Sequence, residues 1–254
     1  MRIINRQLGL GLSALLLANI AAAESVGETA FDHAAHLKEH GGQIYQLTTL
    51  DAKWVRNEAG QGALQSEWES WIGSDENKVF LKGHAEKAES EEASFGISAL
   101  YSRNVADYWD VQGGVRYRYD KNKPTDKARY DAVVGLYGMA PYYFETEAYL
   151  YVGQDDQLSL SIETERDILF TQKLIMQPYL QMDLLMNDES KYAKKTGLSH
   201  IAMGIETRYE ISKKFMPFVD VSYQYNRGNE QTLWQDGSSS DQSWVYGAGL
   251  RVKF

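Results

Sequence analysis

Residues 244–254 read WVYGAGLRVKF, and their side chains alternate between two kinds. One parity is apolar and consists of Trp244, Tyr246, Ala248, Leu250, Val252 and Phe254. The other is mostly small or charged and consists of Val245, Gly247, Gly249, Arg251 and Lys253. Because a strand sends successive side chains to opposite faces, this segment has one apolar face and one small or charged face. That pattern is typical of the closing strand of an outer-membrane barrel, with lipid on the apolar side and the lumen on the other.

The same two-residue period recurs along most of the preceding chain. Twelve segments show it and are predicted strands, namely residues 43–56, 63–74, 79–89, 93–104, 108–120, 128–140, 143–154, 157–170, 173–187, 198–212, 215–227 and 242–254. One such segment would also fit a soluble sheet with a single wet face. Twelve in series, with no helical segment between them, indicate an all-β chain that closes into a transmembrane antiparallel β-barrel of about twelve strands. Pro178 lies inside the ninth strand and predicts a bulge or a strained hydrogen-bond ladder there.

The connections between the predicted strands sort by length. Most of the long polar ones fall on odd-numbered links, which are residues 57–62, 90–92, 121–127, 155–156, 188–197 and 228–241. The even-numbered links are shorter, at residues 75–78, 105–107, 141–142, 171–172 and 213–214. Transmembrane barrels have short periplasmic turns and longer outer loops. We therefore expect a barrel in the outer membrane of a Gram-negative cell, with both chain ends periplasmic and the last strand paired with the first.

The N-terminal residues have the pattern of a processing signal. Arg2 and Arg6 precede an apolar run at residues 8–20, and three alanines at 21–23 supply a small-residue cleavage site. This run is too short for a spanning helix. We expect a signal peptide at residues 1–23, a short His-bearing periplasmic segment at residues 24–42, and the barrel at residues 43–254.

The composition excludes several classes of site and partner. The 254 residues suffice for one large β-domain, and the absence of Cys excludes disulfides and thiolate metal sites. A formal charge of −9 argues against nucleic acid as a partner and is compatible with cations. The sequence has no G-x-S-x-G, H-E-x-x-H or G-x-x-x-x-G-K-[ST] motif, so we do not expect an enzyme.

An ordered series of short motifs resembles one known family. The motifs are WESWIGSD at 68–75, VFLK at 79–82, LYSR at 100–103, YWDVQGGVRY at 108–117, GMAPYYFE at 138–145, LFTQKL at 169–174, RYEI at 208–211 and FMPF at 215–218. Together they cover residues 50–254 and resemble the copper resistance protein B family of outer-membrane proteins. The resemblance implies a barrel in a copper-tolerance system, in contact with membrane lipid and copper ions and working beside periplasmic copper-binding proteins. Many members carry a Met/His-rich segment before the barrel, whereas residues 24–42 hold three His and no Met. If copper capture depends on the extended segment, this chain should be a weaker or different binder.

Three histidines lie close together in that short segment. His33, His36 and His40 are spaced i, i+3, i+7, which puts all three on one face of a helix. Imidazole nitrogen is a suitable ligand for copper or zinc. These residues predict a metal site at the periplasmic mouth of the barrel, and the alternative is a solvated tail that carries no site.

Three further metal candidates lie in predicted strands. His84 shares the parity of Lys82 and Glu86, and His200 shares the parity of Glu206 and Arg208, so both should face the lumen. Two interpretations are open for each imidazole there: it binds a metal near a carboxylate, or it is one of the polar side chains that fill the lumen. Met139 shares its parity with charged residues and is the candidate thioether ligand. Four other methionines lie on apolar parities of predicted strands and are expected to face lipid, namely Met176, Met182, Met186 and Met203.

Charged residues are numerous on the lumenal parity. The carboxylates are Glu67, Glu69, Glu86, Asp110, Glu145, Glu147, Glu163, Glu165, Asp183, Glu206, Glu210 and Asp220, and the cations are Lys82, Arg116, Arg118, Arg208, Arg251 and Lys253. Buried charges must pair, so we interpret this set first as a structural network and second as a cation path. The leading hypothesis is a barrel that binds copper ions or moves them across the outer membrane. A non-conducting docking platform for periplasmic copper proteins and a general small-solute pore are the alternatives.

Overall fold

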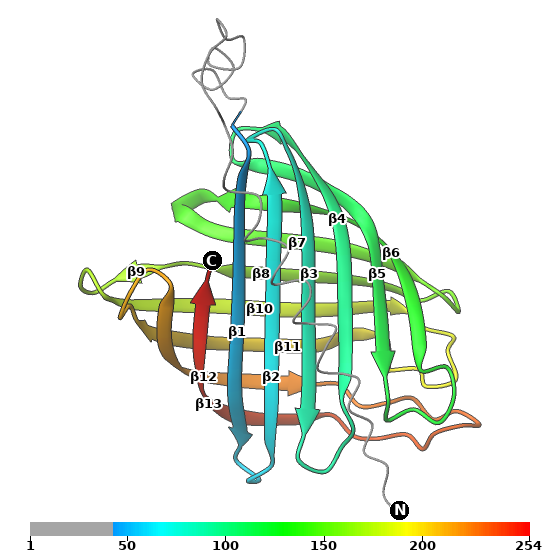
Figure 1. The fold of residues 1–254 in the computed structure, drawn as a ribbon. Helices are drawn as coiled ribbons and strands as arrows, with labels where there is room; N and C mark the ends of the chain where they lie inside the picture. Colours follow the sequence, from blue (N-terminus) through cyan, green and yellow to red (C-terminus); the bar gives the residue numbers. More distant parts are fainter. Residues whose placement is uncertain (1–42) are drawn as a thin grey trace, which may run out of the picture. The chain divides into compact units, whose positions relative to one another are not determined.

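The computed structural model describes residues 43–254, which form a closed antiparallel barrel of twelve long strands (Figure 1). The strands are β1 (Tyr45–Asn57), β2 (Gly62–Gly73), β3 (Asn77–Ala88), β4 (Ser94–Ala106), β5 (Trp109–Asp120), β6 (Ala128–Ala140), β7 (Phe144–Gly153), β8 (Leu158–Glu165), β10 (Leu174–Asn187), β11 (Gly197–Tyr209), β12 (Phe215–Asn226) and β13 (Asp241–Lys253). A two-residue strand, β9 (Ile168–Leu169), and a single 3₁₀ turn, η1 (Pro141–Tyr143), lie between them. Within residues 43–254 no helix has the length and hydropathy needed to cross a bilayer. The predicted all-β barrel is confirmed.

The last strand closes the barrel against the first, as the sequence predicts. β13 pairs with β1 from Asn57 opposite Val245 to Thr49 opposite Lys253. Beyond that ladder, the backbone N–H of Phe254 donates to the carbonyl of Thr48 at 2.9 Å. In Figure 1 the strands β1 to β5 cross β10 to β12 at a steep angle, as the tilt of strands in a closed barrel requires.

The eighth predicted strand, residues 157–170, is wrong as a single element. β8 ends at Glu165, and β9 resumes the ladder only at Ile168. The predicted irregularity around Pro178 is related to this break. Pro178 lies in regular register with Ile205 on β11, whereas no residue of β8 or β9 is in register with it on the other side. The interruption therefore affects the neighbouring strand and not the ladder between β10 and β11.

The outer surface is strongly apolar. Among residues 43–254, thirty-five large hydrophobic side chains are exposed and twelve hydrophobic side chains are buried. The outward set includes Met186 and Met203, which confirms that these two methionines lie on the lipid side. A water-soluble monomer does not expose so much apolar surface, so this face is the one that contacts the hydrocarbon core.

The inner surface carries an apolar cluster as well as the charged residues that the sequence predicts there. Phe80, Leu100, Val133 and Tyr149 form a buried cluster inside the barrel, and Trp71, Tyr137 and Tyr151 pack against it. These residues come from β2 to β7. The lumenal face of that half of the wall therefore carries a packed apolar and aromatic cluster.

The two ends of the barrel differ. The loop end carries residues 58–61, 89–93, 121–127, 154–157, 188–196 and 227–240 between strands. The turn end carries the remaining connections, together with Gln43 and Phe254. Exposed aromatic side chains gather in the turn-end connections, at Tyr108, Tyr142, Tyr143 and Phe170, as in the aromatic girdles of membrane barrels.

The long loops contact one another at the loop end. The ammonium of Lys191 forms an ion pair with Asp126 at 2.7 Å and lies 5.2 Å from the centroid of the Trp234 ring. The side-chain amide of Gln235 donates to the carbonyl of Ala193 at 2.6 Å. These contacts join the loops 121–127, 188–196 and 227–240 into one connected layer.

Candidate functional site

A small cavity lies inside the barrel, with about 50 Å³ of space for water centres. Its walls come from β1, β2, β8 and β10 to β13, and of these strands only β2 also contributes to the apolar cluster. The lining residues are Asp51, Lys53, Gln65, Glu67, Glu163, Glu165, Gln177, Tyr179, Gln181, Glu206, Phe218, Asp220 and Arg251. A volume of this size holds only a few waters, because one water needs about 10–15 Å³ on this measure.

Carboxylates outnumber cations in this lining. Six of the lining residues are Asp or Glu and two are Lys or Arg. None of the ion pairs found among residues 43–254 involves Glu67, Glu163 or Glu165. Glu163 and Glu165 also lie directly opposite Glu147 and Glu145 across the β7–β8 ladder. Like charges in such positions repel each other, so this wall favours the presence of a cation.

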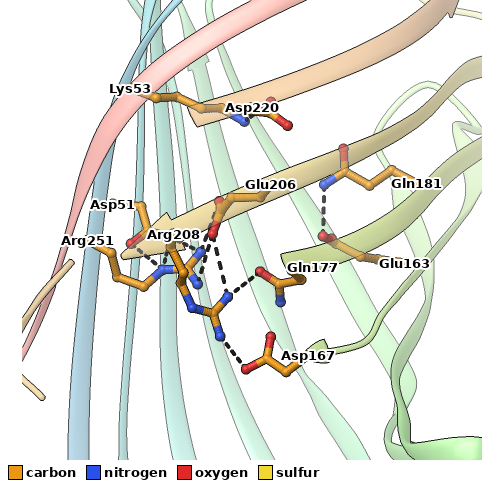
Figure 2. A network of polar contacts seen from close by, with 10 residues as sticks. All are labelled: Asp51, Lys53, Glu163, Asp167, Gln177, Gln181, Glu206, Arg208, Asp220 and Arg251. Carbon is orange, nitrogen blue, oxygen red and sulfur yellow. Dashed lines mark hydrogen bonds and ion pairs between the residues drawn. The ribbon is translucent and has the colours of Figure 1, made fainter. Parts of the chain in front are cut away.

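Arg251 lines the cavity, and Arg208 lies beside it in the same polar network (Figure 2). Both bonds from Arg251 Nε to the Asp51 carboxylate measure 2.9 Å, and Arg251 Nη2 lies 2.7 Å from Asp51 Oδ2. Arg251 Nη1 is 3.3 Å from Glu206 Oε1, and Arg208 Nη1 is 3.5 Å from the same oxygen. Arg208 also donates to Gln177 at 2.7 Å and to Asp167. This network links β1, β8–β9, β10, β11 and β13 across the barrel.

A second group of contacts fixes Asp220, which is 2 % exposed. The Tyr179 hydroxyl donates to both carboxylate oxygens, at 3.0 and 3.1 Å, and Lys53 Nζ lies 3.5 Å away (Figure 2 shows the lysine pair). Tyr179 reaches Asp220 by passing over Gly204, where a Cβ would stand 2.6 Å from the phenol oxygen. The glycine therefore makes room for the ring that holds the carboxylate.

The predicted metal ligands lie apart from one another. His84 on β3 is opposite Glu67 and Gly96, and a Cβ on Gly96 would stand 2.5 Å from its imidazole Cε1. His200 on β11 has its Nδ1 2.7 Å from Asn226 Oδ1, and Met139 on β6 is opposite Glu145. Their strands are not neighbours in the barrel wall.

Metal ligation by these residues stays a prediction. In the part of the chain from residue 43 onward, no group of three or more His, Cys, Asp or Glu side chains is placed to hold a metal ion. The residues His33, His36 and His40 lie outside the described residues.

Sequence reasoning missed three charged members of the polar network. Asp51 and Lys53 share a parity with the buried Val55 on β1, so alternation along the first strand was sufficient to place them in the lumen. Asp167 lies in the break between β8 and β9, and no periodic signal marks it. Its role depends on Arg208, which approaches from β11.

Comparison with solved structures shows the same fold at low sequence identity. The NanC porin has a TM-score of 0.54 and 12% identity, over 81% of this chain and 100% of that chain. The KdgM porin has a TM-score of 0.51 and 10% identity, over 81% of this chain and 99% of that chain. Both similarities concern the barrel architecture alone.

Sequence comparison gives the family. Residues 44–254 match the family described as copper resistance protein B precursor (CopB). Copper resistance protein B of Escherichia coli is 30% identical over 216 residues, which is 85% of this chain and 71% of that protein. A copper resistance protein B homolog of Pseudomonas syringae pv. tomato is 27% identical over 229 residues, 88% of this chain and 76% of that protein. The chain belongs to the copper resistance protein B family and has the fold of an outer-membrane β-barrel.

Proposed function

We propose that this barrel moves copper ions across the outer membrane through the carboxylate-lined cavity. The observation that carries the proposal is the charge of the cavity wall, in which six carboxylates face two cationic side chains. The family has a role in copper resistance, which supports copper as the cation in this proposal. The turn end, with Gln43 and Phe254, faces the periplasm in this proposal, and the loop layer faces outward.

The donor atoms of the cavity favour a hydrated, oxygen-liganded ion. Its lining offers carboxylate, amide and phenol oxygens, and neither His nor Met is among the lining residues. Oxygen ligands suit Cu(II) better than Cu(I), which thioethers select. Glu67, Glu163 and Glu165 supply weak successive ligands, as conduction requires an ion that enters and also leaves. The imidazoles of His33, His36 and His40 would capture copper at the periplasmic mouth.

Ion flux into liposomes tests the proposal. Purified protein is reconstituted, and entry of Cu²⁺ and of K⁺ is followed with entrapped indicators. We expect Cu²⁺ to enter faster than K⁺, and the variant E163Q/E165Q to lower the Cu²⁺ rate by roughly tenfold, because it removes two of the six carboxyl groups that line the cavity. The matched control E58Q/E91Q removes two exposed loop carboxylates and should keep the wild-type rate.

The other outcomes separate the remaining hypotheses. No flux of either ion would eliminate transport and support the docking platform for periplasmic copper proteins. Equal flux of both ions would indicate a general pore. A copper titration of the H33A/H36A/H40A variant tests the N-terminal segment, and an unchanged affinity would remove that segment from the proposal.

A further inference from the structure

The ammonium of Lys82 lies inside the barrel, between two carboxylates and three aromatic rings. Lys82 Nζ is 3.0 Å from Glu69 Oε2 and 2.6 Å from Glu147 Oε1. It also lies 5.7, 5.3 and 5.4 Å from the ring centroids of Phe80, Tyr137 and Tyr149. We name these five residues, Glu69, Phe80, Tyr137, Glu147 and Tyr149, the ammonium cage.

This side chain bridges two distant parts of the barrel wall. Lys82 belongs to β3 and its partner Glu147 belongs to β7, so three strands separate them along the sheet. Lys82 is next to Phe80 on the lumenal face of β3, and Phe80 belongs to the apolar cluster. The ammonium of Lys82 therefore packs against that cluster. No other lysine of residues 43–254 contacts three aromatic rings.

A chain of hydrogen bonds continues from the cage into the same half of the lumen. The Tyr149 hydroxyl donates to Gln112 Oε1 at 2.5 Å, and Gln112 donates to Ser102 at 3.2 Å. Ser102 donates to Asp110 at 2.9 Å, and Asp110 is paired with Lys78 at 2.8 Å. Gln112 and Ser102 are fully buried. This half is thus filled by satisfied polar groups as well as by apolar ones.

We propose that Lys82 is a tethered cation that occupies a cation-binding cage, closes the β2–β7 side of the lumen and confines ions to the carboxylate-lined cavity opposite. Two carboxylates and three ring faces around one nitrogen are the chemistry that binds an ammonium ion. The cage would therefore bind a small organic ammonium or a monovalent cation if the lysine were removed. This inference deepens the proposed transport function by naming the residue that restricts its route.

Single-barrel conductance and reversal potential in a KCl gradient test the inference. We expect K82A to raise K⁺ conductance on the order of threefold and to shift selectivity toward cations, because Glu69 and Glu147 lose their counterion. n-Propylammonium supplies the three carbons and the ammonium that K82A removes, so millimolar amounts should restore the wild-type conductance. n-Propanol, which has the same carbon chain and no charge, should not restore it.

The matched control is K121A. Lys121 also forms an ion pair with a glutamate, Glu92, at 2.6 Å, but both side chains are exposed in loops at the loop end. K121A should leave conductance and selectivity unchanged. Folding of every variant is checked by the heat-dependent gel mobility of the barrel. A second variant, K82M/E69Q/E147Q, removes the charges of the cage. It should not show the gain in cation selectivity expected of K82A, and n-propylammonium should not change its conductance.

Two results would overturn the inference. One is a folded K82A barrel with wild-type conductance and reversal potential, and the other is a K121A effect of equal size. Its failure is distinct from failure of copper transport. If wild-type barrels pass no copper while K82A raises K⁺ conductance, the transport proposal fails and the cage stands. If wild-type barrels pass copper while K82A leaves K⁺ conductance unchanged, the cage fails and the transport proposal stands.

Discussion

The backbone N–H of Arg166 donates to the carbonyl of Pro178 at 3.2 Å, at the point where β8 leaves the ladder. In an antiparallel strand the N–H and carbonyl of one residue point to the same side. Pro178 therefore faces the β8–β9 break with the edge that has no N–H to donate. The break and the proline occupy one position in the barrel, so neither leaves an unpaired donor within the wall.

This placement predicts that replacing Pro178 is tolerated and that introducing a proline at Leu180 is not. P178V should change the free energy of unfolding by less than about 1 kcal/mol, because no ladder bond uses an N–H at that position. L180P, two residues along on the same edge and opposite Thr164, should prevent folding, since it removes a ladder bond at membrane depth. Heat-dependent gel mobility distinguishes the two variants, and a folded L180P barrel would contradict the assignment.

The Tyr179–Asp220 contact predicts a measurable loss of stability. Y179F removes the hydroxyl that donates to a buried carboxylate and should cost about 1–3 kcal/mol. G204A should cost a similar amount, about 1–3 kcal/mol, because its Cβ displaces the ring. Urea unfolding followed by tryptophan fluorescence measures both. If the two act through one ring, the double variant should lose less than the sum of the single changes.

The Arg251 network predicts a larger loss of stability than the Tyr179–Asp220 contact. R251M leaves Asp51 and Glu206 without their shared guanidinium and should cost about 3–5 kcal/mol. The additional change D51N should recover part of that loss. Lys253 lies on the same face of β13 and takes part in none of the ion pairs found among residues 43–254, so K253M is the matched control and should cost little. Equal losses for R251M and K253M would contradict a specific role for the network.

The loop layer should depend on pH. The hydrogen bond from the Lys191 ammonium lowers the pKa of Asp126 below its usual range. A carboxyl with a lowered folded-state pKa stabilises the folded loops above its ordinary pKa, and this contribution is lost as pH falls through the lowered value. We expect amide protection in residues 188–196 to be complete near pH 7 and reduced near pH 3. D126N should lower protection at both values, and pH-independent protection in the wild type would disprove the link.

Much of the fold was predictable because a membrane barrel makes unusually regular demands on its sequence. Every strand must present one face to lipid and one to the lumen. Parity alone therefore assigns Leu250 to the lipid side and Arg251 to the lumen. Closure between residues 43–56 and 242–254 followed from the need to remove sheet edges. The lumenal placement of Glu206 and Arg208 was predicted by the same alternation and is confirmed by their burial.

The rest could not be read from alternation, because it depends on contacts across the lumen. Phe80 shares the parity of Lys82, and the pattern assigns it to the lumen without saying that it joins Leu100, Val133 and Tyr149 in one cluster. The β8 break lies opposite Pro178 on β10, and the pattern of residues 157–170 does not contain that residue. The Asp126–Lys191 pair joins two loops whose mutual position follows from barrel geometry and not from local sequence.

The seam between β1 and β13 also has a kinetic consequence. Asp51 and Arg251 are separated by 200 residues in the chain. Bringing such distant ends together costs about 5 kcal/mol of loop entropy before any contact at the seam offsets it. The seam should therefore form late, and contacts of this range make folding slow. A chain that has not yet closed carries two unpaired strand edges, so it is most exposed to aggregation shortly before it becomes most stable.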